Sequence, residues 1–234
     1  MENSVKFLFS GDSALVIEFG NEISVDINKK IRKMMDNIKK ENIDGIVELV
    51  PTYCSLLINY DVLKVDYQSL VEKLKTLLND DNETIEDEEV TLIEIPTLYN
   101  DECGPDLSYV AEYNKLSKEE VIKIHTGTDY LVYMLGFMPG FTYLGGMSEK
   151  IATPRLESPR LQIYPGSVGI AGKQTGMYPS MSPGGWRIIG RTPLKLYNPD
   201  SETPVYISSG DYIRYVSISE EEYNNILKKV ENNE

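Results

Sequence analysis

The stretch from Gly136 to Arg191 constrains the fold of this 234-residue chain most strongly. It holds 11 of the chain's 17 glycines and 6 of its 12 prolines. Such a density is typical of flexible linkers, but aromatic and aliphatic residues are interleaved here, which solvated linkers lack. Because glycine supplies positive φ and proline fixes turn corners, we expect many tight turns on a packed β scaffold.

The same stretch is cationic within an acidic chain. It contains six Lys and Arg residues against two Glu, whereas the whole chain has a formal net charge of −14. A positive patch with exposed backbone amides suits a carboxylate or a phosphate. The arginines could equally tie loops to nearby carbonyls and acids, so the residues alone leave both interpretations open.

The bulk composition excludes several classes of protein. A hydrophobic content of 41% is enough for a real core, and the acidic balance argues against nucleic acid as a partner. No apolar run is long enough to span a membrane, and the start lacks the apolar segment of a signal peptide. Cys54 and Cys103 cannot form a disulfide framework, so we expect reduced thiols in a cytoplasmic protein.

The first third of the chain alternates between strand and helix patterns. Short apolar segments bounded by turn residues predict strands at 5–9, 14–19, 45–50 and 55–60. Apolar residues at spacings of three and four predict helices at 23–40 and 67–78. Two amphipathic helices with four strands indicate an α+β sandwich of the ferredoxin-like kind.

Residues 79–89, NDDNETIEDEE, contain seven acids and one apolar residue. A solvated, self-repelling segment of this kind is typical of a boundary between domains. We therefore expect domains at 1–88 and 89–234. The segment could instead be a charged loop inside one domain.

The rest of the chain predicts short elements separated by frequent turns. Capping boxes at Ser117/Glu120 and Ser219/Glu222 begin helices that run to His125 and Val230, and an earlier helix is expected at 107–116. Strands are expected at 90–99, 130–135, 161–164, 167–171, 186–189, 194–197, 205–208 and 212–216. So many short strands indicate a closed β-barrel.

His125 is the only histidine of the chain. It could act as a general base or a hydrogen-bonding ligand, or it could simply be a helix C-terminal histidine that the dipole favours. No second histidine or cysteine pair offers the spacing of a zinc site, so no metal is expected.

The segment GSVGIAGKQTG, residues 166–176, invites a P-loop interpretation, which fails. Ser167 stands where the first glycine belongs, and Gln174 follows Lys173 where Ser or Thr is needed. The loop could still hold a phosphate or carboxylate through its amides. Tyr178 and Trp186 could line a pocket wall, although such residues more often belong to the core.

Several long motifs occur in order along nearly the whole chain: GDSALVIEFG (11–20), GPDL (104–107), His125, GFMPGFTYLGG (136–146), Pro-Arg (154–155 and 159–160), PGSVGIAGKQTGMYP (165–179) and SPGGWRIIGRT (182–192). Together they resemble the family of 5-oxoprolinase B subunits, also called allophanate hydrolase subunit 1 or the kinase A inhibitor (KipI) family. One departure is Ser-Gly-Asp at 209–211, where the family often has Pro-Gly-Asp.

The resemblance implies a ferredoxin-like domain followed by a cyclophilin-like β-barrel. It implies one subunit of an ATP-dependent 5-oxoprolinase, which opens 5-oxo-L-proline to L-glutamate; the chain would need homologues of the C and A subunits as partners and would be inactive alone. ATP is then the cofactor of the assembled complex. The alternative is a KipI-type inhibitor that binds a sporulation histidine kinase. Prolyl isomerase activity would rest on fold analogy alone.

The motifs also yield an expected set of site residues. The expected catalytic residues are His125, Arg155, Arg160 and Gln174, with the arginines holding charge and the other two orienting groups. The expected substrate-binding residues are Ser167, Gly169, Gly172, Tyr178, Trp186 and Arg191. Nucleic acid and membrane are not expected as partners.

Overall fold

In this computed structural model the chain is described over residues 5–78 and 91–232. It divides into two units, residues 1–90 and residues 91–234, which are unit 1 and unit 2 below. Both units combine helices with strands, so the expected α+β class is confirmed. The acidic segment 79–89 and the boundary expected within it lie outside the described residues.

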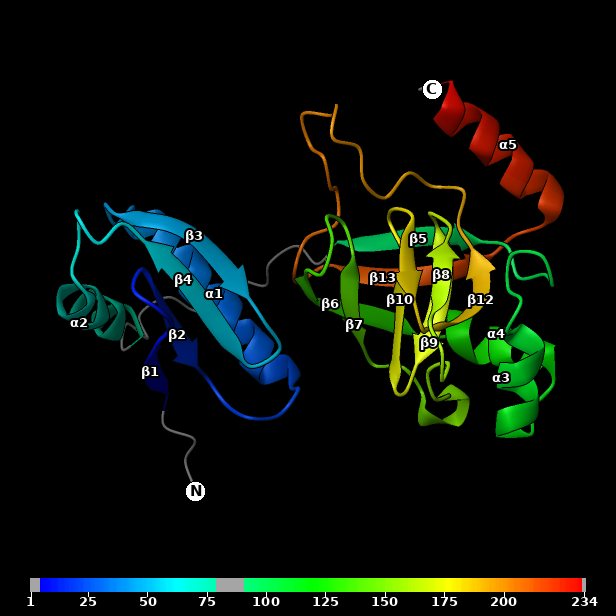
Figure 1. Ribbon diagram of the computed structural model, residues 1–234, viewed down its shortest axis with the longest axis horizontal. Helices are drawn as coiled ribbons and strands as arrows, with labels where there is room; N and C mark the ends of the chain where they lie inside the picture. The colour runs from blue at the N-terminus through cyan, green and yellow to red at the C-terminus, as the bar shows by residue number, and fades with distance from the viewer. Residues whose placement is uncertain (1–4, 79–90, 233–234) are drawn as a thin grey trace. The chain divides into compact units, whose positions relative to one another are not determined.

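Unit 1 is a four-stranded antiparallel sheet with two helices (Figure 1). The sheet order is β1-β2-β4-β3, and each neighbouring pair is antiparallel. The elements in chain order are β1 (Lys6–Phe9), β2 (Ala14–Glu18), α1 (Val25–Glu41), β3 (Ile46–Pro51), β4 (Ser55–Tyr60) and α2 (Tyr67–Leu78).

Alternation along the two central strands places the core of unit 1 on one face of the sheet. Leu15 and Ile17 of β2 and Leu56 and Ile58 of β4 are fully buried, and they join the apolar stripes of α1 and α2 in one cluster. Because successive strand residues point to opposite faces, the residues between them face away from the helices. The two helices therefore cover a single face of this sheet.

The first helix is bounded by its caps and not by its apolar pattern. Ser24 has an extended backbone, and its side chain accepts a hydrogen bond from the backbone N–H of Asp26, so α1 begins at Val25. Asn42 adopts the left-handed conformation, with φ 48°, and ends the helix. The apolar pattern alone predicts 23–40.

Unit 2 contains three hydrogen-bonded sheets within its described residues (Figure 1). Their orders are β5-β13-β6-β7, β10-β9-β12 and β11-β8, and β13 is parallel to β5. The elements are β5 (Leu92–Thr97), α3 (Leu107–Asn114), α4 (Lys118–Thr126), β6 (Asp129–Leu135), β7 (Thr142–Gly145), a 3₁₀ helix η1 (Glu149–Ile151), β8 (Arg160–Ile163), β9 (Ser167–Ala171), β10 (Gln174–Met177), β11 (Ser182–Gly184), β12 (Arg187–Arg191), β13 (Tyr212–Ser217) and α5 (Glu220–Glu231).

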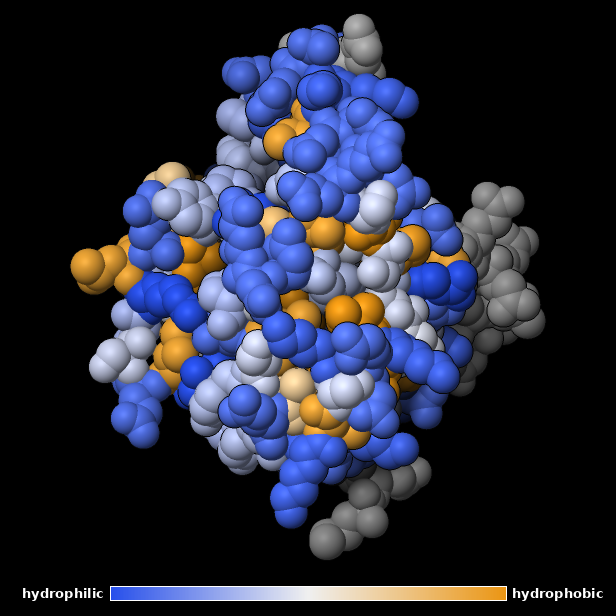
Figure 2. Space-filling model, turned by 90° about the vertical axis from the view of Figure 1, so that its right-hand side faces the viewer, coloured by the Kyte–Doolittle hydropathy of each residue, from blue (hydrophilic) through white to orange (hydrophobic). Residues whose placement is uncertain are grey.

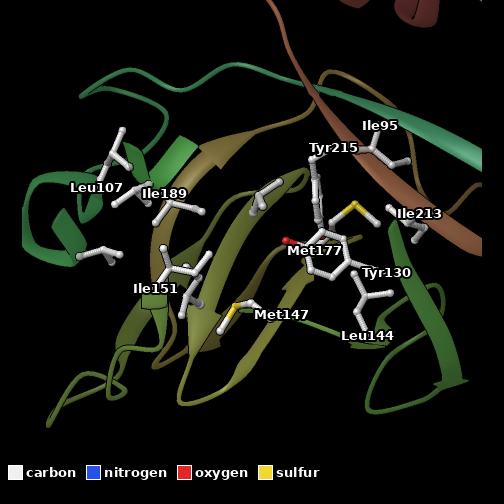
Figure 3. Close-up of a cluster of buried hydrophobic side chains, with 14 of the residues drawn as sticks. Ile95, Leu107, Tyr130, Leu144, Met147, Ile151, Met177, Ile189, Ile213 and Tyr215 are labelled. Atoms are coloured by element: carbon white, nitrogen blue, oxygen red, sulfur yellow. The ribbon is translucent and has the colours of Figure 1, made fainter. Parts of the chain in front are cut away.

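The main core of unit 2 lies between its two larger sheets. Figure 3 shows Tyr130 and Tyr215 directed toward Met177, so side chains from β6, β13 and β10 meet there. Strands β7 and β10 lie side by side, and a β-bridge joins Leu98 to Arg191. The sheets thus bend around one core.

The closed barrel expected from the sequence is not present in the described part of the chain, since the strands form separate sheets. The strands expected at 194–197 and 205–208 are also absent. Pro193, Pro199 and Pro204 lie close to these segments and lack the N–H group that a sheet ladder needs. Their apolar side chains are still used, because Leu196 and Ile207 are buried in the core.

Three strands of unit 2, β7, β10 and β11, have no strand pattern in the sequence. Each is three or four residues long and contains glycine, and β11 also contains Pro183. Such segments carry too few alternating apolar residues for a period of two to be recognised.

Neighbouring leucines on β4 provide a test of the sidedness of unit 1. Leu56 is fully buried among the helices and Leu57 is half-buried on the opposite face. Leu56→Ala should lower the stability of unit 1 by about 2–5 kcal/mol because it removes buried contacts and leaves a cavity. Leu57→Ala is the matched control and should cost less than half as much.

Hydrogen–deuterium exchange of peptides from β2 and β4 measures this difference. Leu56→Ala should accelerate the slowest exchanging amides by about 30-fold or more, since each 1.4 kcal/mol is a factor of ten. Equal acceleration by the two substitutions would show that the sheet has no preferred buried face.

Candidate functional site

A buried carboxylate organises the cationic stretch of unit 2. Asp106 is 5% exposed and accepts two hydrogen bonds from the guanidinium of Arg160, at 2.8 and 2.9 Å, and one from the backbone N–H of Ile188, at 2.7 Å. Arg187 lies 3.8 Å from the same carboxylate. Paired, hydrogen-bonded burial of this kind is how a protein accommodates an interior charge.

The GPDL turn places this carboxylate against β12. The backbone N–H of Asp106 donates to the carbonyl of Ile188 at 2.9 Å. A Cβ atom on Gly104 would lie 2.1 Å from the carbonyl oxygen of Ile189, so no larger residue fits there. The close approach that only glycine permits thus fixes where Asp106 enters the sheet.

Trp186 connects the predicted residues Arg155, Arg160 and Tyr178. The Arg155 guanidinium lies over its ring at 5.9 Å, Arg160 approaches its carbonyl at 3.5 Å, and the Tyr178 ring packs edge-on at 6.2 Å. Both arginines also act electrostatically on the Tyr178 hydroxyl, although burial dominates and raises the pKa of Tyr178 to about 12. We call Arg155, Arg160, Tyr178 and Trp186 the Arg155 site.

Arg155 is the accessible cation of this site. Its side chain is exposed. The segment that carries it is held by backbone hydrogen bonds, between Thr153 and Gly172 and from the N–H of Leu156 to the carbonyl of Gly185. Arg155 makes no ion pair with a carboxylate of the described residues, whereas Arg160 is neutralised by Asp106. Of the expected charge-holding residues near Trp186, Arg155 is therefore free to receive an anion.

The glycine-rich segment at 166–176 forms a β-hairpin. Gly172, with φ 61°, and Lys173 connect β9 to β10, the arrangement expected of a tight hairpin turn with glycine first. Strand β9 pairs with β10 on one side and β12 on the other, and all of its residues are buried. The backbone around Ser167 and Gly169 is thus used in the sheet and does not form an open amide-lined loop.

Two further expected site residues lie at the ends of strands. Gln174 begins β10 and is half-buried. Arg191 ends β12, where its guanidinium lies 5.1 Å from the ring of Tyr164. Their roles as catalytic and substrate-binding residues remain predictions.

His125 lies at the end of α4, inside the core. It is fully buried, with Nδ1 2.8 Å from the Tyr99 hydroxyl and Nε2 2.8 Å from the Thr175 hydroxyl. The Thr175 hydroxyl also donates to the Gly169 carbonyl at 3.1 Å, which leaves it to accept from Nε2–H, while Nδ1 accepts from Tyr99. Burial lowers the pKa of His125 to about 3, so the ring is a neutral, positioned part of the core.

Within the described residues, neither metal-ligating side chains nor cysteine thiols form a second candidate site. No cluster of His, Cys, Asp or Glu suited to a metal ion occurs among them. Cys54 and Cys103 are free thiols, and burial raises the pKa of both, which reduces their nucleophilicity. In the described residues, none of the helices has the length and hydropathy needed to span a bilayer.

Asp106 and Arg187 were not among the expected site residues. Asp106 stands within the GPDL motif, and Arg187 follows Trp186 directly. Their pairing joins positions far apart in the chain, and neither residue carries a local spacing signal for it. The sequence feature that sets Asp106 apart is that it is the single charged residue of the GPDL motif.

The amino-acid sequence is similar to those of several known proteins. The sequence model of the family described as carboxyltransferase domain, subdomain C and D, matches residues 5–207 of this chain. The chain is 46% identical over 222 residues to the 5-oxoprolinase B subunit of Bacillus subtilis (strain 168), covering 91% of this chain and 92% of that protein. It is 36% identical over 209 residues to the 5-oxoprolinase B subunit of Escherichia coli O157:H7, covering 88% and 93%.

One solved structure is similar over a comparable range. It is that of conserved uncharacterized protein PH0987 from Pyrococcus horikoshii, with a TM-score of 0.56 and 51% sequence identity. The similarity covers 93% of this chain and the whole of that chain.

The burial of His125 predicts a defined pH dependence of stability. Its pKa is about 3 in the folded state and about 6.5 in an unfolded chain, so the unfolded state binds more protons between these values. Stability should be complete above pH 6.5 and should fall on acidification by up to about 1.4 kcal/mol per pH unit. Nuclear magnetic resonance of this single imidazole should show no titration between pH 8 and pH 5. A midpoint near 6.5 in the folded protein would contradict the buried placement.

Two bidentate Asp–Arg pairs provide a matched test of the buried carboxylate. Asp106→Asn should destabilise unit 2 by about 3–5 kcal/mol, because it leaves Arg160 without its buried partner. Asp129→Asn breaks the exposed pair with Arg214 and should cost about 1 kcal/mol or less. Urea unfolding followed by the fluorescence of Trp186 reports on both. Equal losses would show that Asp106 is not the organising group.

Proposed function

The chain belongs to the family of 5-oxoprolinase B subunits, within the carboxyltransferase domain, subdomain C and D, and on this premise we propose that it is one subunit of a 5-oxoprolinase. The observation that carries the proposal is the 46% identity to a known B subunit over 91% of the chain. The proposed substrate is the cyclic amide 5-oxo-L-proline, opened to L-glutamate with the help of homologues of the C and A subunits.

The chemistry of the substrate explains why further groups are required. A lactam is a stable amide, so opening it at neutral pH calls for activation. ATP is the proposed co-substrate of the assembled complex, since phosphorylation of the amide oxygen creates a good leaving group. This chain then has to hold the substrate and stabilise negative charge as it develops.

Arg155 is the proposed anion-binding residue of this subunit. It is exposed, lies over Trp186 and makes no ion pair with a carboxylate of the described residues. A guanidinium can bind a carboxylate through two parallel hydrogen bonds, which suits the carboxylate of 5-oxoproline. Arg160 and Asp106 hold the neighbouring backbone in place through their buried pair.

His125 is proposed to act through other residues and not on the substrate. It is buried and neutral, and its two hydrogen bonds fix Tyr99 on one side and Thr175 of β10 on the other. The imidazole thereby holds the β9–β10 hairpin, which lies beside the Arg155 segment through the bridge between Thr153 and Gly172. Gln174 at the start of β10 keeps its proposed orienting role.

The finer description of the fold is also a proposal. In unit 1, the order β1-β2-β4-β3 with both helices on one face supports a ferredoxin-like arrangement in which the N-terminal strand fills an edge position. In unit 2, the neighbouring strands β7 and β10 and the Leu98–Arg191 bridge support a cyclophilin-like, partly open barrel. Division of the chain after residue 90 supports a boundary close to residues 88 and 89.

The alternative of a kinase inhibitor is less well supported. The relatives from Bacillus subtilis and Escherichia coli described above are named as enzyme subunits. An inhibitor that docks through the hydrophobic residues between Phe137 and Tyr143 would need them exposed, but Phe141 is buried and Phe137 is the large hydrophobic residue among them that is strongly exposed. The proposed function is therefore that of an enzyme component in the cytoplasm.

The role of Arg155 can be tested in the reconstituted enzyme. Arg155→Ala, assembled with the homologues of the C and A subunits, should raise the KM for 5-oxoproline about 10-fold or more, because a charge-assisted hydrogen bond contributes about 1.5–3 kcal/mol. Arg214→Ala is the control, since Arg214 pairs with Asp129 on another sheet. ATP-dependent glutamate release is the measurement.

Two results would count against the proposal at different levels. Unchanged kinetics for Arg155→Ala would remove Arg155 from the substrate site while leaving the proposed enzyme intact. A well-formed complex of all three proteins that releases no glutamate would exclude 5-oxoproline as the substrate.

A further inference from the structure

The helices α1 and α2 leave one face of the unit 1 sheet uncovered. The buried residues Leu15, Ile17, Leu56 and Ile58 point toward the helices. Because successive strand residues point to opposite faces, the residues between them lie on the other face, which we call the open face. The register of the four strands fixes which side chains are neighbours on it.

An apolar strip crosses the open face from one edge of the sheet to the other. Leu8 of β1 lies opposite Val16 of β2. Leu57 of β4 lies opposite Val16 on one side and Val50 of β3 on the other. Leu8 is 41% exposed, and the other three are half-buried and stand outside the cluster that packs on the helices. We call Leu8, Val16, Leu57 and Val50 the apolar row.

Polar side chains border the apolar row on both sides, and they pair with one another. On one side, Lys6 and Glu18 form an ion pair at 2.8 Å. On the other side, Asn59 Nδ2 donates a hydrogen bond to the Glu48 carboxylate at 2.9 Å. Because these groups already have partners, the open face requires no counter-charge from a binding partner. An apolar centre with a polar rim is the composition of a protein interface.

Isolated apolar side chains on a surface would not by themselves indicate an interface. Figure 2 shows hydrophobic groups interspersed with hydrophilic ones on the displayed side of the molecule, as is usual for protein surfaces. The apolar row differs, because the register of one sheet holds its four members side by side. A continuous strip of this kind is best covered by a surface that is itself apolar and electrically neutral.

The open face is complementary to a second copy of itself. When two copies stack face to face about a two-fold axis parallel to the strands, the strand order of one copy runs opposite to that of the other. Leu8 then faces Val50 of the second copy, and Val16 faces Leu57. Each larger side chain meets a smaller one, which lets facing layers interdigitate, and every contact occurs twice, as in an isologous interface.

The charges of the open face are compatible with self-association. The chain has a formal net charge of −14, so two copies repel each other at long range. In the stacked arrangement, however, Glu18 faces Ser55 of the second copy and Glu48 faces Ser10. The contact therefore places no carboxylate of this face opposite another, and the remaining repulsion is screened by salt.

We propose that two copies of this chain associate through the open faces of unit 1, with the apolar row of each copy stacked on that of the other about a two-fold axis. An assembled enzyme then contains this subunit in pairs. The contact uses no residue of the Arg155 site, so the inference stands apart from the proposed function.

Sedimentation velocity of the full chain tests this association. A small apolar contact is expected to have a dissociation constant in the micromolar range, so the chain is measured from about 1 to about 300 µM. Leu57→Asp should weaken dimerisation at least about 10-fold, because it places an unpaired charge in the middle of the apolar row. Leu63→Asp is the matched control, since Leu63 is 92% exposed but lies in the turn after β4. Added salt should strengthen the wild-type dimer, because it screens the repulsion between copies.

Two edge variants test the alignment of the copies. Leu8→Lys and Val50→Glu should each weaken the dimer, whereas their equimolar mixture should restore it, because the two introduced charges are opposite and face each other across the contact. Both positions lie on the edge strands β1 and β3, where a polar side chain can reach water. The thermal midpoint of each separate variant shows that it is folded before the proteins are mixed.

Each outcome decides between the alternatives. A wild-type chain that remains monomeric at about 300 µM would overturn the proposal, and so would a dimer that Leu57→Asp leaves intact, since its contact would lie elsewhere. Loss of the dimer in folded Leu8→Lys and Val50→Glu without recovery on mixing would overturn the stacked alignment. Glutamate release by the reconstituted enzyme is measured separately, so a missing reaction with preserved dimerisation counts against the proposed function and not against this contact.

Discussion

The buried ion pair between Asp106 and Arg160 is the interaction on which the cationic stretch of unit 2 depends. One carboxylate accepts hydrogen bonds from Arg160 and from the backbone of Ile188, and it lies near Arg187. Three segments distant in sequence are thereby held together, namely the GPDL turn, β8 and β12. Without this acid, two arginines would lie together partly buried and uncompensated, which low-dielectric surroundings penalise strongly.

That pairing also sorts the arginines by role. The acid neutralises Arg160 and leaves Arg155 without a carboxylate partner among the described residues, although both contact the same tryptophan. A cluster that looks uniformly cationic in sequence is thus one structural pair beside one available charge. The division follows from the position of a single acid about fifty residues upstream, which composition cannot reveal.

Elements with caps or long periodic patterns were predictable, and short glycine-bearing strands were not. The helices opened by Ser117 and Ser219 start where their capping boxes indicate. By contrast, 205–208 reads as a strand from its residues and yet runs through unit 2 without sheet pairing, directly after Pro204, which has no N–H group for a sheet ladder. Local sequence preferences set the starts of the capped helices. Whether a short segment pairs in a sheet depends on tertiary packing and on the backbone N–H groups available to it.

The same distinction applies to the candidate site. The residues around Trp186 were expected to lie together, and Arg155, Arg160 and Tyr178 do. Within the GSVGIAGKQTG segment the strand expected at 167–171 is present as β9, but the anion-binding amides considered for the same segment are used in sheet pairing and a hairpin turn. Glycine density therefore indicates either backbone exposure or backbone crowding, and only the neighbouring strands determine which.

The placement of the single histidine has a consequence for how this protein responds to its surroundings. His125 is neutral and sealed in the core, and no other imidazole exists in the chain. Histidine is the side chain whose unperturbed charge changes between pH 5 and 8. The surface therefore carries no imidazole whose charge changes in that range, and ionic strength is a variable that screens its encounters with charged molecules.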